Sequence, residues 1–217
     1  MDFFNLLKRV SNLKWSTDDP IPKTFDDVLL TSKIAMQQAL IELWHSYPFT
    51  FKKVTRYQIL PAFENAIESP SGELIGITLE GGRKLECLND TTMVFDDQTY
   101  GTPEGYRVES GNSGDKIIFY PTPKEPISVG IIYQTACPAR DKSGTERLNL
   151  TEATDTLNIG GIVQRELFEN ALILLTQVYL IHDTSDENYI PYQQAYHKAL
   201  QRLIGYTPKI NSKKVVI

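Results

Sequence analysis

The residues of this chain that are able to do chemistry are few and widely separated. Its three histidines are His45, His182 and His197. Each lies near the polar side or the end of an expected helix, and the sequence contains no His-x-x-x-His, Cys-x-x-Cys or His-Glu-x-x-His pattern. We therefore predict no zinc site and interpret the histidines as surface or partly buried side chains.

Adjacent acidic residues are the next candidates, for acid–base chemistry or for a cation. They occur at Asp18–Asp19, Asp26–Asp27 and Asp96–Asp97. Adjacent carboxylates usually cap helices, form turns or are solvated. Asp96–Asp97 has further acids nearby, Asp90 and Glu104, but their spacing does not fit an EF-hand loop. We predict no metal site.

Glycines and serines give no better catalytic pattern. Gly160–Gly161 precedes an expected helix but lacks the Lys-Ser/Thr that completes a phosphate loop. Ser110, Ser113 and Ser143 lie in turns, and no Gly-x-Ser-x-Gly elbow is present. The sequence therefore predicts that the protein is not an enzyme, with no catalytic residues and no cofactor.

Composition restricts the class of protein further. The 217 residues are 41% hydrophobic and 23% charged, the balance of a globular protein with one domain or two small ones. The formal net charge of -5 argues against a protein that holds nucleic acid by its phosphates. No run approaches the roughly 18 apolar residues that span a bilayer, and the amino terminus does not resemble a signal peptide. We expect no membrane anchor, and we interpret Cys87 and Cys137 as thiols rather than a disulfide.

Apolar spacing predicts four helices, at about residues 2–14, 25–47, 161–182 and 188–204. Thr24 and Asp27 resemble a capping pair at the start of the second helix. The core face of that helix is expected to include Leu29 and Ile34. In the third helix, the apolar face is expected to include Ile162 and Val163, with the following residues facing outward: Gln164, Arg165, Glu169 and Gln177. Gly205 is a plausible C-cap of the fourth helix.

Between residues 49 and 133 the period changes toward two, which predicts β-structure. Leu74–Leu79 and Lys84–Leu88 are expected to form a hairpin through Gly81–Gly82, because glycine accepts the positive φ angles of a tight turn. Further strands are expected at residues 117–120 and 127–133, with an exposed loop at 89–114. The aromatic residues at the junction of helix and strand are interpreted as a buried core rather than a stacking platform: Trp44, Tyr47, Phe49 and Phe51.

These elements predict an α+β fold in which the two ends of the chain form one domain. Residues 1–48 and 150–205 are expected to make a composite helical bundle, and residues 49–149 an inserted antiparallel β domain. Residues 206–217 are expected to form an extended C-terminal arm.

The arm contains the only partner-binding residues that we predict: Tyr206, Pro208, Ile210, Lys213, Lys214, Val215, Val216 and Ile217. One interpretation is a frayed terminus. The other is β-addition or insertion into a groove of a neighbour, in which the last three apolar residues anchor the arm and the two lysines meet acidic partners.

Six segments, in this order, resemble the head–tail adaptor proteins of tailed bacteriophages. They are Ile34–Trp44, Tyr47–Phe51, Tyr57–Pro61, Gly101–Val108, Tyr120–Pro123 and Thr154–Ile159. The fourth contains a Gly-x-Pro-x-x-Tyr turn, and the fifth a Tyr-Pro-Thr-Pro turn between strands. Lys124–Pro126 and the loop from Asn89 to Gly101 do not match the pattern, so they are candidates for contacts specific to one phage.

The resemblance implies a structural virion protein without enzymatic activity. Such adaptors assemble as a ring, a dodecamer, dock onto the portal protein and present a platform to the next tail ring or tail protein. This chain would then be made in the host cytoplasm, reside at the head–tail interface of the virion, and line part of the channel through which genomic DNA passes during ejection without specific binding. The alternative is a tail or baseplate β-module that binds carbohydrate or another virion protein.

Overall fold

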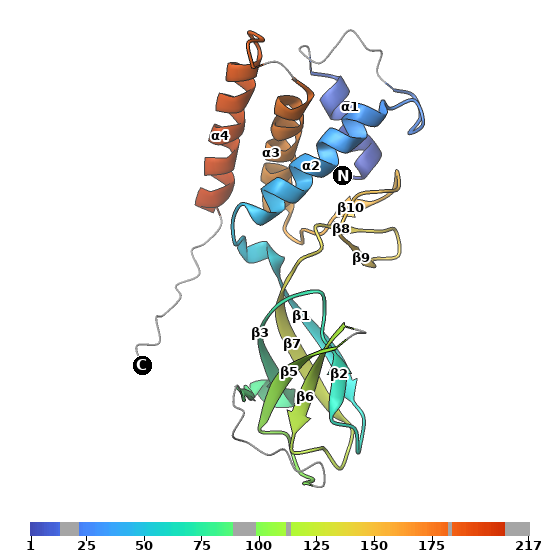
Figure 1. The fold of residues 1–217 in the computed structure, drawn as a ribbon, viewed down its shortest axis with the longest axis vertical. Coiled ribbons are helices and arrows are strands. Elements are labelled where there is room, and N and C mark those ends of the chain that lie inside the picture. The colour runs from blue at the N-terminus through green and yellow to red at the C-terminus, as the bar shows by residue number, and fades with distance from the viewer. Residues whose placement is uncertain (14–21, 89–98, 112–113, 182–183, 207–217) are drawn as a thin grey trace. The chain divides into compact units, whose positions relative to one another are not determined.

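The computed structural model describes residues 1–13, 22–88, 99–111, 114–181 and 184–206. It contains helices together with antiparallel and mixed sheets, so the chain is an α+β protein, as predicted. The chain divides into two compact units (Figure 1). A helical unit contains Met1–Lys52 and the chain from Cys137 onward, and a β unit contains Lys53–Ala136.

The helical unit contains the four helices α1 (Phe3–Ser11), α2 (Leu30–His45), α3 (Ile162–Leu180) and α4 (Tyr189–Tyr206). Helix α3 contacts each of the other three helices, and Figure 1 shows it between α2 and α4. Two helices come from each end of the chain. All four helices that the apolar spacing predicts are therefore present, although some of their bounds differ.

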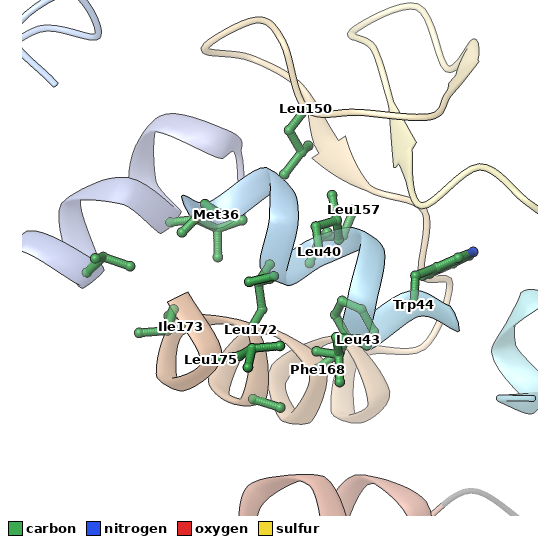
Figure 2. Packing of buried hydrophobic residues seen from close by; sticks show 14 of the residues in the cluster. Met36, Leu40, Leu43, Trp44, Leu150, Leu157, Phe168, Leu172, Ile173 and Leu175 are labelled. Atoms are coloured by element: carbon green, nitrogen blue, oxygen red, sulfur yellow. The ribbon is translucent and has the colours of Figure 1, made fainter. Parts of the chain in front are cut away.

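The core of this unit is built mainly where α2 meets α3 (Figure 2). Leu40 and Leu43 of α2 are fully buried, as are Phe168 and Leu172 of α3. Burying a side chain of this size stabilises the folded state by about 1.5–3 kcal/mol. This contact joins segments that lie far apart in the sequence, so it holds the two ends of the chain in one unit.

A small sheet completes the helical unit. Its strands β8 (Ala139–Arg140), β9 (Glu146–Arg147) and β10 (Thr156–Leu157) pair in the order β10-β8-β9. The helical unit also contains two segments that the sequence assigns to the β domain. They are residues 49–52, which include the short helix η1 (Thr50–Lys52), and residues 137–149. The physical reason is burial, because Phe49 and Ala139 belong to the helical core.

The β unit contains two sheets. Strands β1 (Lys53–Leu60), β7 (Ile127–Thr135) and β3 (Gly72–Leu79) pair antiparallel in the order β1-β7-β3. The second sheet has the order β2-β6-β5-β4, formed by Ala66–Glu68, Gly114–Tyr120, Gly105–Gly111 and Glu86–Cys87. The pairing of β4 with β5 is parallel, so this domain is not purely antiparallel.

Alternating side chains of these strands form a core separate from that of the helices. Val129, Ile131 and Tyr133 of β7 are buried, two residues apart along the strand. Ile77 from β3 and Phe119 from β6 belong to the same cluster, so both sheets contribute to it.

The predicted hairpin of residues 74–88 forms only in part. Gly81 and Gly82 have φ angles of 83° each, as the turn requires, and they lie in the short helix η2 (Glu80–Gly82). Beyond the turn, a single bridge joins Thr78 to Lys84, while the ladder of β3 is formed with β7. Thr78 pairs with both Gly130 and Lys84, so β3 has β7 along one edge and a single bridge to the segment after the turn along the other.

The loop expected at residues 89–114 is also partly wrong. Gly105–Gly111 forms strand β5, which pairs with β6 and buries Tyr106. Residues 89–98 and 112–113 lie outside the described residues. Strand β5 carries exposed polar residues after its first half, and for this reason its sequence reads as a loop.

The capping pair Thr24 and Asp27 forms its reciprocal bonds, but no helix follows it directly. The Thr24 amide donates to Asp27 Oδ2 at 2.8 Å, and the Asp27 amide donates to Thr24 Oγ1 at 3.4 Å. The hydrogen bond from the Thr24 amide lowers the pKa of the Asp27 carboxyl. Helix α2 begins only at Leu30, so this pair stabilises a turn.

The expected faces of α2 and α3 and the expected end of α4 need correction. Leu29 and Ile34 near the start of α2 are exposed, as are Ile162 and Val163 at the start of α3. Glu169 and Gln177, expected to face outward, are buried. Each has a polar partner at the amino-terminal end of the chain. Glu169 binds the Met1 ammonium, and the Gln177 side-chain amide donates to the Val10 carbonyl oxygen in α1. Helix α4 continues through Gly205, which therefore does not cap it.

Candidate partner-binding surfaces

The predicted arm lies almost entirely outside the described residues. Residues 207–217 are not among them. Tyr206 is the last residue of α4 rather than part of an extended segment, and 49% of its surface is exposed. The candidate surfaces must therefore be sought in the remainder of the chain.

The chemically capable residues do not converge in the part of the chain that the structure describes. His45 is exposed at the end of α2 and His197 is exposed on α4. Asp26–Asp27 lies in the turn before α2, whereas His182 and the other two acidic pairs lie outside the described residues. Within the described ranges, no group of three or more His, Cys, Asp or Glu side chains is placed to hold a metal ion. The two cysteines belong to different units, with Cys87 exposed and Cys137 buried.

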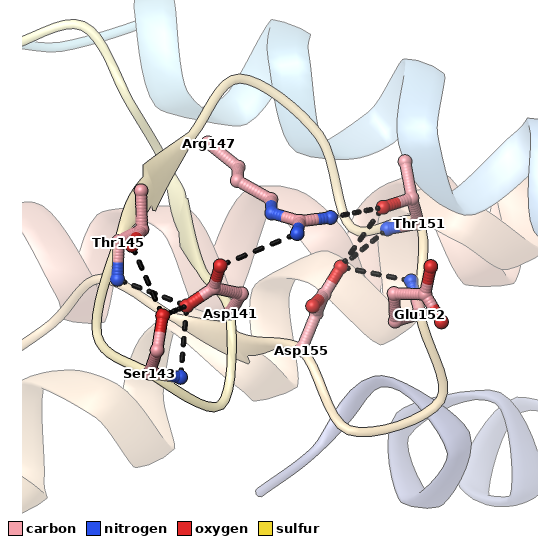
Figure 3. A network of polar contacts seen from close by, with 7 residues as sticks. All are labelled: Asp141, Ser143, Thr145, Arg147, Thr151, Glu152 and Asp155. Atoms are coloured by element: carbon pink, nitrogen blue, oxygen red, sulfur yellow. Dashed lines mark hydrogen bonds and ion pairs between the residues drawn. The ribbon is translucent and has the colours of Figure 1, made fainter.

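The densest polar cluster surrounds Asp141, in the turn between β8 and β9 (Figure 3). Asp141 Oδ1 accepts from Ser143 Oγ at 2.5 Å and from the amides of Ser143 and Thr145 at 2.9 Å each. The Ser143 hydroxyl is the largest cause that lowers the pKa of Asp141 to about 2. This carboxylate closes its own turn.

A second carboxylate closes the following turn in the same way. Asp155 is fully buried, and its Oδ2 accepts from the amides of Thr151 and Glu152 at 2.7 and 2.8 Å. Arg147 links the two turns, since its guanidinium donates to Thr151 Oγ1 at 3.0 Å and to Asp141 Oδ2 at 3.2 Å. Both carboxylates shape the loops of the helical unit, because each accepts hydrogen bonds from backbone amides of its own turn.

One amine in the helical unit has an unusual environment. Lys52 is buried, with 5% of its surface exposed, and its Nζ lies 5.3 Å from the centre of the Trp44 ring and 5.6 Å from that of Phe49. Burial lowers the pKa of the amine to about 8. Among the described residues, no carboxylate lies within ion-pairing distance of it. The aromatic faces are the attractive partners that the structure provides.

The aromatic residues around Lys52 form a core, as the sequence predicts. Trp44 and Phe49 are buried, and the rings of Phe49 and Phe51 stack with their centres 4.9 Å apart. Phe168 of α3 packs edge-on against this group, 5.9 Å from Trp44. A buried cluster of this kind offers no platform for a ligand.

Exposed apolar side chains define three surfaces that have the character of binding sites. The first is the α2 stripe, formed by Leu30, Ile34 and Ile41, which are 69%, 47% and 45% exposed. At 100° per residue, the three positions fall within about 40° of one another around the helix axis. The opposite face of α2 is buried in the core, so the helix is apolar on two sides.

The second surface is the outer face of β1, where Tyr57 and Ile59 are largely exposed. The Tyr57 ring lies over Gly130 of the adjacent strand β7. A Cβ at position 130 would lie 3.1 Å from Tyr57 Cε1 and 2.7 Å from Thr78 Oγ1. A side chain at position 130 would therefore crowd both groups, and glycine leaves the space that they occupy.

The third surface is the aromatic corner, formed by Phe63 and Tyr100 in two loops of the β unit. Their ring centres lie 5.8 Å apart with the ring planes at 74°, and the rings are exposed, Phe63 to 68%. Phe63 has a φ of 61°, in the left-handed region that a bulky residue rarely adopts. Its amide donates to Pro123 O at 2.8 Å, which fixes this conformation. The sequence does not predict that Phe63 is unusual, since this feature depends on a backbone φ angle.

Comparison with protein-family models and with curated proteins finds no match to this chain. Along the described part of the chain, no helix has the length and hydrophobicity needed to cross a bilayer. The features of the molecule that bear on its function are therefore the two-unit architecture and these three surfaces.

Proposed function

We propose that this chain is a structural virion protein, a subunit of a bacteriophage head–tail adaptor ring. The observation that carries the proposal is the division of the chain, in which both ends build a helical unit and the middle builds a β unit. This is the organisation that the resemblance implies. In the proposal, the subunit docks onto the portal, joins the capsid to the tail and presents a platform to the next tail protein.

The α2 stripe supports assembly into a ring. Large apolar side chains gathered on one exposed face of a helix favour burial by a partner. A ring subunit contacts its two neighbours through two different surfaces. Such heterologous contacts form a closed ring when the rotation from one subunit to the next divides a full turn into a whole number of steps. In the proposed dodecamer, the helices act as a bundle and the α2 stripe is covered by an adjacent copy.

The charge of the chain fits a wall around passing DNA. With a net charge of -5, the subunit repels phosphates on average, and a duplex moves through such a channel without being held. The proposal places the protein at the head–tail interface of the virion. It also assigns residues 207–217 to an arm that binds a neighbouring protein by β-addition or groove insertion.

Native mass spectrometry of the full chain, alone and with its candidate portal ring, tests the proposal. The expected result is a monomer that joins the portal as a closed twelvefold ring. Deletion of Val215–Ile217 is expected to weaken this docking. A chain that stays monomeric in the presence of the portal contradicts the adaptor function.

The aromatic corner favours one alternative, a tail or baseplate β-module that binds carbohydrate or another virion protein. Exposed aromatic rings offer a large contact area to a partner. This alternative predicts that the monomer ignores the portal and binds a glycan or a tail protein instead. The same mass spectrometry experiment, with those ligands added, separates the two functions.

A further inference from the structure

The backbone of Phe63 is the most unusual feature of the β unit. Its φ of 61° is unfavourable for an aromatic residue, whereas glycine and asparagine adopt such angles more readily. Backbone strain of this kind persists where the surroundings impose it and is frequent at binding sites. Two hydrogen bonds hold the loop in place, one from the Phe63 amide to Pro123 O and one from the Glu64 amide to Pro61 O.

Burial within the protein does not compensate for this strain. The Phe63 side chain remains 68% exposed, and the ring contact that the structure gives it is the edge-on one with Tyr100. A residue that costs free energy through its backbone and gains little from packing is explained by a contact with another molecule. The exposed faces of the two rings, set at 74°, form the receiving surface.

The loops around the corner offer few hydrogen-bond donors. The amides of Phe63, Gly101 and Thr122 already donate to carbonyl groups within the unit. Four nearby prolines have no amide hydrogen to give: Pro61, Pro121, Pro123 and Pro126. A carbohydrate needs several donors and acceptors, so this surface suits an apolar peptide segment better.

The charges beside the corner indicate what flanks that segment. Among the described residues next to it in the sequence, Glu64 and Glu125 are exposed and Lys124 carries the opposing charge. An apolar occupant that carries basic residues therefore matches best. The other two surfaces match it less well, because Arg56 and Lys53 lie on the strand of Tyr57, and Lys33 lies beside Ile34 on α2.

The chain itself contains a segment with this chemistry, Lys213-Lys214-Val215-Val216-Ile217. We propose that the aromatic corner receives residues 213–217 of a second copy of this chain. Six residues, 207–212, separate this segment from the end of α4 and reach at most about 20 Å. Since each copy has one corner and one segment, the contact is heterologous and suits a closed ring. In this respect the inference rests on the proposed function.

A peptide of residues 206–217 tests the recognition directly. Its binding is measured by fluorescence anisotropy on the chain that lacks residues 207–217, which keeps every element that the structure describes. We expect binding that weakens with salt, since two lysines face carboxylates. Phe63→Asn should lower the affinity at least tenfold while the melting temperature stays the same or rises, because asparagine relieves the strain.

Two further variants make the result specific. Tyr100→Ala leaves the Phe63 backbone unchanged and should also lower the affinity at least tenfold. Tyr57→Ala removes an equally exposed aromatic ring from another face of the same unit and should leave the affinity unchanged. Peptide binding that survives both Phe63→Asn and Tyr100→Ala, or that is absent in the unsubstituted chain, overturns the proposal.

The full chain decides whether the segment comes from a second copy. Self-association that increases with concentration and is reduced by Phe63→Asn supports the proposal. A full-length monomer that refuses the peptide, while the shortened chain accepts it, shows that the segment occupies the corner of its own copy and overturns the proposal. Portal binding is scored separately: a Phe63→Asn chain that still forms the ring refutes only this contact, whereas peptide binding without any portal ring refutes only the adaptor function.

Discussion

The side-chain amide of Gln177, on α3, donates a hydrogen bond to the carbonyl oxygen of Val10, on α1, at 2.8 Å. Glu169, two turns earlier on α3, binds the Met1 ammonium at 3.0 Å and lies 3.9 Å from Arg9. Both α3 side chains are buried, so α1 is fixed to α3 by polar contacts beside its apolar residues. The polar contacts specify how α1 lies on α3, since apolar contacts alone are not directional.

Substitution of Gln177→Leu is expected to loosen α1 without unfolding the rest of the unit. The variant loses one buried hydrogen bond, which contributes about 1 kcal/mol. Hydrogen exchange should therefore become faster in residues 3–11 and stay unchanged in the β unit. Asn170→Leu, at an exposed position of the same helix, is the control and should not alter exchange in α1. Equal exchange in both variants would show that the Gln177 contact does not hold α1.

Substitution of Lys52→Met is expected to stabilise the protein at neutral pH. Burial lowers the pKa of the folded-state amine to about 8, against about 10.5 in the unfolded chain. The folded state therefore carries a penalty below pH 8 that is relieved as the pH rises from 8 to 10.5. Removal of the charge should raise the free energy of unfolding at pH 7 by on the order of 1–3 kcal/mol, less the lost attraction to the aromatic rings.

Urea denaturation at pH 7 and pH 10 measures this effect. The unsubstituted chain should gain stability between the two values, and Lys52→Met should lack that gain. Lys53→Met, at the adjacent exposed position, should behave like the unsubstituted chain. A Lys52→Met variant that is less stable at pH 7 would mean that the cation–π contact outweighs the cost of burial.

Substitution of Asp141→Asn is expected to change the acid sensitivity of the helical unit. The hydrogen bond from Ser143 lowers the pKa of Asp141 to about 2, below the ordinary value of 3.8. The folded state binds this proton less readily than the unfolded state, so the stabilisation is complete above about pH 4 and is lost as the pH falls to 2. Melting temperatures between pH 5 and pH 2 should fall less steeply in Asp141→Asn than in the control Asp26→Asn. If the melting temperatures of the two variants fall equally with pH, groups other than Asp141 cause the loss of stability in acid.

The sequence predicts elements well where local pattern and burial agree. The apolar positions of α4 recur at three and four residues, and Tyr192, Tyr196, Ala199 and Leu203 are buried as this spacing requires. The pattern fails for α2, because this helix is apolar on two opposite sides and its periodicity does not distinguish the core face from Ile34. It also fails at Thr24 and Asp27, whose capping bonds form around a turn.

Features that depend on distant partners could not be predicted. Glu169 and Gln177 are polar, so they are expected at the surface, and only the position of α1 explains their burial. The ladder of β3 with β7 joins strands that lie far apart in the sequence, so the local turn signal at Gly81–Gly82 does not predict it. Phe63 has no sequence signal, since its role follows from a φ angle and from Tyr100, which lies 37 residues later in the sequence.

Substitution of Ile34→Glu is expected to prevent ring assembly while the subunit stays folded. Ile34 lies at the centre of the α2 stripe and is 47% exposed, so a charge there remains solvated in the monomer and changes its stability by less than about 0.5 kcal/mol. In the proposed ring an adjacent copy covers this face, and a buried unpaired carboxylate would then be strongly unfavourable. Native mass spectrometry with the portal should show at least a tenfold loss of the ring. Ile75→Glu, which places the same charge at a similarly exposed isoleucine of the β unit, is the control for charge alone. If Ile34→Glu assembles as well as the control, the α2 stripe is not the contact between copies.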